Sequence, residues 1–170
     1  VDGRPPQDTL VSLRDLGPAL RRGEWQVVAT LADVGDALRL VRVNPAQQVL
    51  PALGLAIDLG TTTVVAELVE VETGNTLASR LAYNAQRQFG TDVTTRMMHA
   101  EKPGGLAELR QAILNTLNEL VDALCAEAKH ESDAIAAVVI ASNTVMMHLL
   151  LGLDPSSIRR DPYIPATTVF

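Results

Sequence analysis

The part of this chain that most constrains its fold is residues 55–66, where two apolar segments flank one short polar turn. The turn holds Gly60, Thr61 and Thr62, and Asp58 lies near the end of the first apolar segment. A glycine has no side chain, so backbone N–H groups beside it can approach phosphate oxygens closely, and hydroxyls add donors. A carboxylate at this position can hold Mg²⁺ through its bound water, because Mg²⁺ loses water reluctantly. The pattern predicts a nucleotide-binding set of Asp58, Gly60, Thr61 and Thr62, with Asp58 as the catalytic and magnesium-holding residue.

The same pattern has a second interpretation that involves no ligand. Asp and Thr side chains in turns often bond their own backbone, so residues 55–66 also suit a plain β-hairpin in which Asp58 braces the turn. Thr63 is expected to begin the second strand under either interpretation.

The residues after the turn predict an α/β fold. Strands at 63–71 and 76–83, joined by a turn at 72–75, complete a three-stranded meander. A helix is expected at 106–130, and the apolar run 134–141 predicts a parallel strand buried on both faces. A second helix is expected to begin after residues 142–144 and to end near Gly152. The apolar face of the first helix is Leu106, Leu109, Ile113, Leu117, Leu120 and Leu124.

The first fifty residues predict a small α+β module that follows the end of a linker. Residues 1–9 are polar and rich in proline, which is typical of a linker. Leucines at helical spacing over residues 10–20 are interrupted by Gly17-Pro18, so two short helices are expected. Strands at 25–31 and 37–43, joined by a loop at 32–36, predict a hairpin.

Two further groups of polar residues are candidate contacts for a ligand or a partner. The first follows the third strand and could contact a partner protein or a nucleotide; alternatively it is an ordered loop in which Asp92 caps a helix at 93–99. Asn143 and Thr144, at a strand-to-helix junction, could bind an anion, although helix capping is the simpler explanation. The members of the first group are Asn84, Gln86, Gly90, Asp92 and Arg96.

Several other reactive side chains are better explained by packing. Met146, Met147 and His148 lie on an apolar helix, and the three histidines of the chain show no spacing typical of a metal site. Cys125 lies beside the apolar face of the long helix, so we expect a buried structural thiol.

The composition argues against several classes of function. The formal net charge is −6, with six basic and six acidic residues in 1–53 and eight and fourteen in 54–170, so binding along a nucleic-acid backbone is not expected. Aromatic residues make up 3%, too few for base stacking, and no apolar run reaches the length of a membrane span. A single cysteine fits a cytoplasmic protein.

The order of the expected elements resembles the first subdomain of the acetate kinase, sugar kinase, heat-shock chaperone and actin superfamily, which has a ribonuclease-H-like fold. Residues 58–62 match its Asp-x-Gly-Thr-Thr signature. Three blocks, at 53–66, 84–96 and 142–155, together resemble the reductive activators of corrinoid proteins. The chain departs from that pattern at Ser142, where glycine is expected, and at Val145, where threonine is frequent.

The resemblance implies a function and a domain order. Members of this family carry a [2Fe–2S] ferredoxin domain, a linker, a middle domain and an ATPase domain, and with ATP they reduce Co(II) corrinoid to Co(I). Residues 10–50 would then belong to the middle domain and residues 51–170 to the N-terminal part of the actin-like ATPase domain. The implied cofactors are Mg-ATP, with Asp58 on the metal, and a [2Fe–2S] cluster in a domain that this chain lacks. The implied partner is a corrinoid protein of a methyltransferase system.

A chain of this extent is expected to be a fragment, inactive by itself and able to form homo-oligomers through unfinished faces. Two alternatives remain open at this point. One is a non-catalytic docking module for a corrinoid protein, and the other is a lobe of a metabolite kinase of the same superfamily.

Overall fold

The computed structural model describes residues 6–7, 10–35 and 37–169. The chain divides into two compact units. One comprises Val1–Gly54, Glu70–Asn75 and Asp133–Val138, and the other comprises Leu55–Val69, Thr76–Ser132 and Val139–Phe170.

The first unit contains a helix packed on a three-stranded sheet. Its elements are β1 (Pro6–Gln7), α1 (Leu10–Arg22), β2 (Val27–Asp33) and β3 (Leu38–Pro45), and the sheet order is β1-β3-β2. Strand β1 runs parallel to β3, and β2 runs antiparallel to it, with Val27 opposite Pro45. The core consists of Ala19, Leu40 and Val43, with Leu16, Val27 and Leu31 packed against it.

The predicted hairpin is present, with strands that begin and end one or two residues later than expected. Residue 36 of its loop lies outside the described residues, and so does most of the segment 1–9 that we expected to be a linker. Of that segment the structure describes residues 6 and 7, which form β1.

The prediction of two short helices at residues 10–20 is wrong, because α1 is one helix of 13 residues with Pro18 inside it. A proline normally clashes with the Cβ of the preceding residue when that residue is helical. Here the preceding residue is Gly17, which has no Cβ. Pro18 has no N–H to donate to the preceding turn of the helix. Leu16 and Ala19, on either side of the Gly17-Pro18 pair, both pack in the core, and their burial stabilises the helix without that hydrogen bond.

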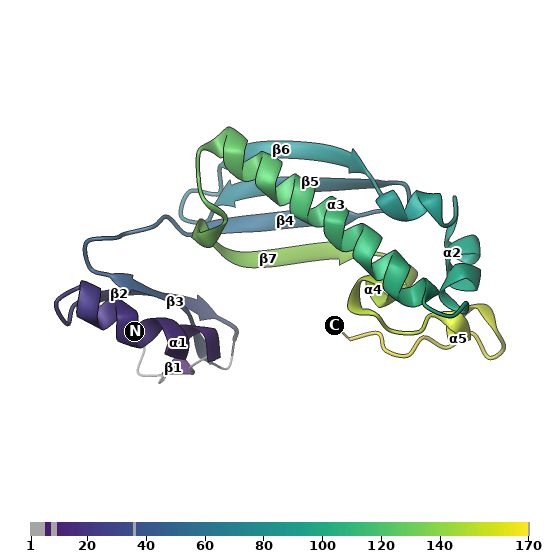
Figure 1. Ribbon diagram of the computed structural model, residues 1–170, viewed down its shortest axis with the longest axis horizontal. Helices are drawn as coiled ribbons and strands as arrows, with labels where there is room; N and C mark the ends of the chain where they lie inside the picture. Colours follow the sequence, from purple (N-terminus) through teal and green to yellow (C-terminus); the bar gives the residue numbers. More distant parts are fainter. Residues whose placement is uncertain (1–5, 8–9, 36, 170) are drawn as a thin grey trace. The chain divides into compact units, whose positions relative to one another are not determined.

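A four-stranded sheet carries the remaining strands, β4 (Leu53–Leu59), β5 (Thr63–Glu70), β6 (Thr76–Tyr83) and β7 (Ile135–Ser142), in the order β6-β5-β4-β7 (Figure 1). Strands β5 and β6 are antiparallel, with Thr63 opposite Tyr83, which confirms the second hairpin of the predicted meander. Ser142 Oγ donates to the carbonyl oxygen of Leu59 at 2.8 Å, so the last residues of β7 and β4 lie side by side. These neighbouring strands are therefore parallel, as predicted.

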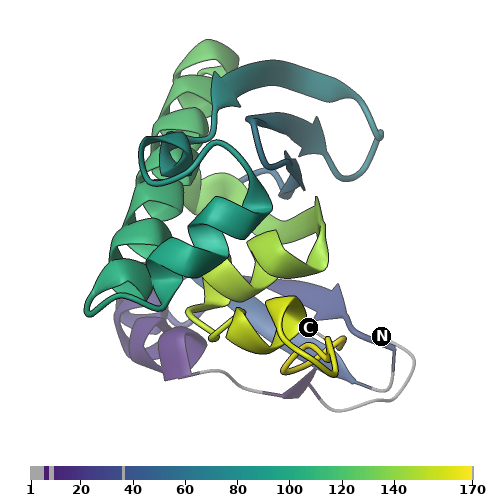
Figure 2. The same ribbon diagram turned by 90° about the vertical axis from the view of Figure 1, so that its right-hand side faces the viewer.

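Helix α3 (Gly105–Ala128) covers one face of this sheet. The other helices that follow β6 are η1 (Ala85–Gln88), α2 (Val93–Ala100), η2 (Ser132–Ala134), α4 (Thr144–Leu151) and α5 (Ser156–Arg159). Helix α3 lies across the strands, and α2 and α4 lie at the end of the sheet where β6 and β7 finish (Figures 1 and 2). Of the predicted apolar face of α3, all members except the half-buried Leu106 are buried.

The prediction that β7 is buried on both faces is wrong. Val138 is 53% exposed and Val139 is 70% exposed. The reason is the position of β7 at one edge of the sheet, whereas α3 packs mainly against β6 at the other edge. Among the described residues no helix covers the face that carries Val139, so a continuous apolar run here marks an edge strand with an open face.

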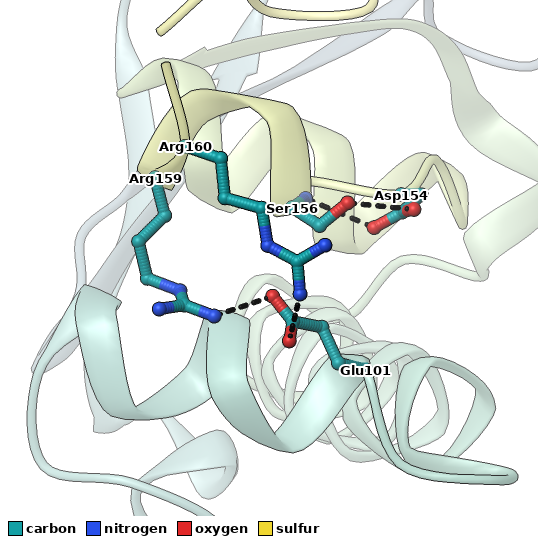
Figure 3. A network of polar contacts seen from close by, with 5 residues as sticks. All are labelled: Glu101, Asp154, Ser156, Arg159 and Arg160. Carbon is teal, nitrogen blue, oxygen red and sulfur yellow. Dashed lines mark hydrogen bonds and ion pairs between the residues drawn. The ribbon is translucent and has the colours of Figure 1, made fainter.

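Ion pairs tie the short helix α5 to the end of α2 (Figure 3). The two carboxylate oxygens of Glu101 accept from Arg159 Nη2 and from Arg160 Nη2, each at 2.7 Å. Asp154 accepts from the backbone N–H and the hydroxyl of Ser156, both at 2.9 Å, at the start of α5. The hydrogen bond from Arg159, aided by the positive charges of both arginines, holds the pKa of Glu101 below its ordinary value despite the opposing effect of burial.

A lowered pKa in the folded state predicts a pH-dependent contribution to stability. The contribution of Glu101 is fully present above its unfolded pKa and is lost as the pH falls through its folded pKa. We therefore expect Glu101→Gln to lower the urea midpoint at about pH 7 and to differ little from the wild type at about pH 3. The control is Glu72→Gln, a change at an exposed carboxylate with no ion pair among the described residues. A Glu101→Gln deficit of equal size at both pH values would contradict the argument.

Candidate functional site

The predicted phosphate-binding residues form the tight turn between β4 and β5. Gly60 N donates to the carbonyl oxygen of Thr63 at 3.0 Å, which closes the hairpin. A Cβ atom on Gly60 would lie 2.6 Å from the same oxygen, closer than a carbon can approach without displacing the strand. The turn therefore requires glycine at this position for a steric reason, whether or not a ligand binds there.

Asn84, the residue after β6, braces this turn from inside the protein. Its side chain is fully buried, and Nδ2 donates to the Gly60 carbonyl oxygen at 3.0 Å while its backbone N donates to that of Thr62 at 2.9 Å. A trans peptide unit points its C=O and its N–H in opposite directions. Because the Gly60 carbonyl faces Asn84, the N–H of Thr61 in the same peptide unit points away from Asn84.

The start of α4 contacts the same turn. Asn143 caps α4, since its Oδ1 accepts from Met146 N at 3.0 Å, and its Nδ2 donates to Thr61 Oγ1 at 3.3 Å. The capping interpretation of Asn143 is confirmed, and the structure adds a contact with the predicted phosphate-binding residue Thr61. Thr144 is exposed, and its carbonyl oxygen lies 2.7 Å from His148 Nδ1.

The carboxylate of Asp58 lies on the open face of the sheet, beside the turn. Among the described residues it has no hydrogen-bonding or ion-pair partner, so Asn84, and not Asp58, braces the turn. Asp58 and Glu67 both line an open hollow of about 400 Å³. The remaining walls are apolar: Ala56, Ile57, Val65, Val139 and Ala141. An exposed, unpaired carboxylate in this position is available to a hydrated cation.

Two of the other predicted contact residues lie in the interior. Gln86 and Arg96 are both fully buried, and Arg96 Nη1 donates to Gln86 Oε1 at 3.2 Å. Arg96 Nε donates to the carbonyl oxygen of Gly90 at 2.9 Å. Burial lowers the pKa of Arg96, and the negative charge of Asp92 partly offsets that effect. These side chains contact protein atoms and hold the loop after β6 together.

Asp92 is exposed and caps α2, as the second interpretation of this loop predicted. Its Oδ1 accepts from Thr95 N at 2.8 Å, and the Thr95 hydroxyl lies 3.3 Å from Asp92 N, which completes a capping box. The hydrogen bond from the Thr95 backbone is the main reason that the pKa of Asp92 is lowered.

The packing explanation for the sulfur and imidazole side chains is confirmed at Cys125, Met146 and His148, all of which are buried. Burial raises the pKa of the Cys125 thiol. His148 Nε2 accepts from Ala166 N at 3.1 Å. Within residues 6–7, 10–35 and 37–169, no group of three or more His, Cys, Asp or Glu residues could hold a metal ion, and no helix is long and apolar enough to cross a membrane.

Sequence reasoning missed two hydroxyls that position the site. Ser142, noted only as a departure from the expected glycine, bonds the last carbonyl of β4. Thr116 Oγ1 accepts from Ala85 N at 3.2 Å, next to Asn84. A polar residue between Ile113 and Leu117 on the apolar face of α3 was the signal that could have revealed it.

Comparisons with known proteins agree with the resemblance found in the sequence. The family model described as "RACo middle region" matches residues 53–170. Corrinoid activation enzyme RamQ of Eubacterium limosum is 35% identical over 115 residues, which cover 67% of this chain and 19% of RamQ. A solved structure described as a reductive activator for corrinoid, iron-sulfur protein is 37% identical, with a TM-score of 0.86 over 99% of this chain and 27% of that one. The chain thus spans about a fifth to just over a quarter of the length of these relatives, and its α/β fold matches a solved activator.

The different structural roles of Asn84 and Asp58 predict different effects of their substitution on the free energy of unfolding. We expect Asn84→Ala to lower the free energy of unfolding by about 1–3 kcal/mol, because it leaves buried backbone groups without partners. Asp58→Asn should change it by less than about 0.5 kcal/mol, since the side chain is exposed and unpaired. Urea unfolding followed by circular dichroism compares the two variants. Equal destabilisation would contradict the assignment of Asn84 as the brace.

Proposed function

The chain belongs to the RACo middle-region family, and from this premise we propose that it forms one part of an ATP-dependent reductive activator of a corrinoid protein. The reaction is the reduction of inactive Co(II) corrinoid to Co(I) in a methyltransferase system. The observation that carries the assignment to this chain is the exposed, unpaired carboxylate of Asp58 beside the braced turn at residues 60–62.

The residues of the turn fit the phosphates of Mg-ATP. The Thr61 N–H points away from Asn84, Thr62 is exposed, and Gly60 adds no side chain, so donors at this turn can face an anion. Asp58 would hold Mg²⁺ through water, because Mg²⁺ is usually bound by one or two carboxylates together with substrate phosphates. Bound Mg-ATP supplies the free energy that an uphill electron transfer requires. This chain would bind and orient its phosphates.

The residues do not fit an iron–sulfur cluster. A [2Fe–2S] cluster of the ferredoxin type needs four thiolates, and this chain has one cysteine. That cysteine is buried, and its pKa is raised, which disfavours the thiolate. We propose that the cluster belongs to another part of the protein, and no electron-transfer step is assigned to residues of this chain.

The domain assignment follows from the same proposal. Residues 51–170 would be the N-terminal part of an actin-like ATPase domain, and residues 10–50 a middle domain that precedes it. The family model named for a middle region begins at residue 53 and does not cover residues 10–50. The assignment of residues 10–50 to a middle domain therefore stays a prediction. The proposed partner is a corrinoid protein, as the descriptions of the relatives suggest.

The role of Asp58 predicts a loss of ATP-dependent activity. In the intact protein we expect Asp58→Ala to reduce ATP-stimulated cobalt reduction by about 10- to 100-fold, the loss typical of a residue that positions a metal through the metal's own ligands, here its bound water. The measurement is the rate of Co(I) formation, followed by absorbance, with and without Mg-ATP.

The matched control is Glu67→Gln, which removes the other carboxylate of the same hollow. Glu67 Oε1 accepts a hydrogen bond from Ser79 Oγ, on the neighbouring strand, at 3.4 Å. We expect the Glu67→Gln variant to keep the ATP stimulation of the wild type. Wild-type ATP stimulation in Asp58→Ala would remove Asp58 from the mechanism.

A further inference from the structure

We propose that Arg96 is a positioning residue for the turn at residues 60–62: its buried guanidinium orients the two amide side chains, Asn84 and Asn143, that hold this turn. The inference rests on the proposed function of the turn as a phosphate-binding site. Arg96 itself touches neither the turn nor the hollow beside it, so its effect on a ligand would pass through these two residues.

The burial of Arg96 requires an explanation. The side chain is fully buried, no carboxylate among the described residues forms an ion pair with it, and Nη2 has no hydrogen-bonding partner. A buried charge without an ion-pair partner is costly, and an apolar side chain of similar volume often fills such a space at lower cost. We therefore explain the arginine at this position by the groups that its N–H donors hold in place, the Gly90 carbonyl and the Gln86 amide.

The first connection runs through Gln86 to Asn84. Arginine only donates hydrogen bonds, so the contact from Nη1 forces the oxygen of the Gln86 amide, Oε1, toward Arg96. Gln86 Nε2 then donates to the carbonyl oxygen of Leu109 at 3.0 Å. Asn84 Nδ2 lies 3.5 Å from Gln86 Oε1, and Asn84 Oδ1 accepts from Gln86 N at 3.0 Å. This arrangement leaves Asn84 with its amide nitrogen toward Gly60, as the brace requires.

The second connection runs through α4 to Asn143. Arg96 Nη1 lies 3.4 Å from Met146 Sδ, and Met146 N donates to Asn143 Oδ1 at 3.0 Å. With its oxygen used by the cap, Asn143 must turn Nδ2 outward, where it donates to Thr61 Oγ1. Both connections therefore start at one nitrogen of Arg96 and end on the same turn.

Loss of the guanidinium should loosen this order of donors and acceptors. Without Nη1, Gln86 Oε1 loses a donor, and the Gln86 amide is then held only by its bond to the carbonyl oxygen of Leu109. Asn84, whose Nδ2 lies 3.5 Å from Gln86 Oε1, is then held less firmly against the Gly60 carbonyl oxygen. A lysine at position 96 keeps the charge, but it is a compact ammonium and cannot reproduce the planar fork that reaches Gly90 and Gln86 together.

The test is a double-mutant cycle on Mg-ATP affinity in the intact protein, measured by titration calorimetry. We expect Arg96→Met and Asn84→Ala each to weaken Mg-ATP binding by about 10- to 100-fold. The double variant should lose much less than the product of the two single losses, because both changes act on the same turn. Losses that multiply would show that Arg96 acts independently of Asn84 and would overturn the proposal, whatever the effect on stability.

The matched control is Arg87→Met. Arg87 is an exposed arginine of the same loop that lies over the ring of Tyr83 at 4.8 Å, and its loss should leave the affinity at the wild-type value. If thermal unfolding shows that Arg96→Met does not fold, the cycle is measured with Arg96→Lys under the same criterion.

The outcomes also separate this inference from the function on which it rests. A wild-type protein that does not bind Mg-ATP, or an Asp58→Ala variant with unchanged affinity, would overturn the proposed function and this inference with it. Wild-type binding that is lost in Asp58→Ala but retained in Arg96→Met would overturn the inference about Arg96 alone.

Discussion

The hydrogen bonds from Asn84 to the carbonyl oxygens of Gly60 and Thr62 are the contacts on which the rest of the site depends. A tight turn exposes polar backbone groups, and those that face the interior need partners there because water does not reach them. The meander brings the end of β6 back beside the β4–β5 turn, so the residue after β6 can supply both bonds. Once these carbonyls point inward, the N–H of Thr61 points the other way. The conformation that satisfies the interior is thus also the one that presents a donor to an anion.

The alternation of side chains along β4 separates the structural residues of this strand from the proposed functional one. Leu55, Ile57 and Leu59 are buried, and they hold the strand in the sheet whatever lies on the other face. Asp58 falls between two of them and must point to the opposite, open face. There its carboxylate keeps its hydration, which a magnesium site held through water needs, without any cost of burying a charge. A shift of one residue in register would bury Asp58 and expose its apolar neighbours, so the hydrophobic pattern itself fixes the side on which a metal could bind.

The sequence predicted the elements with strong local signals, and it failed where distant parts of the chain decide. The strands of the meander, the long amphipathic helix and the cap at Asp92 rest on periodicity and on side-chain chemistry within a few residues. The continuity of α1 depends on packing against β3, which residues 10–20 do not reveal. The exposure of Val139 depends on which face α3 covers. Gln86 and Arg96 could be named only as candidate contacts for a partner or ligand, because a polar cluster in a loop looks the same in sequence whether it faces outward or inward.

The acceptors of Arg96 explain how an interior residue can act on a turn that it does not touch. A single carboxylate could accept the hydrogen bonds of the guanidinium, and the orientation of the neighbouring amide side chains would then not depend on Arg96. Here the acceptors are instead the carbonyl of Gly90, the amide of Gln86 and the thioether of Met146, from two separate segments, the loop after β6 and helix α4. Each segment must keep its position for the guanidinium to keep its hydrogen bonds. Because arginine only donates, the amide of Gln86 has one orientation that presents its oxygen to Arg96. The uncompensated charge thus makes the loop after β6 and the start of α4 depend on each other, and the turn at residues 60–62 is where both make contact.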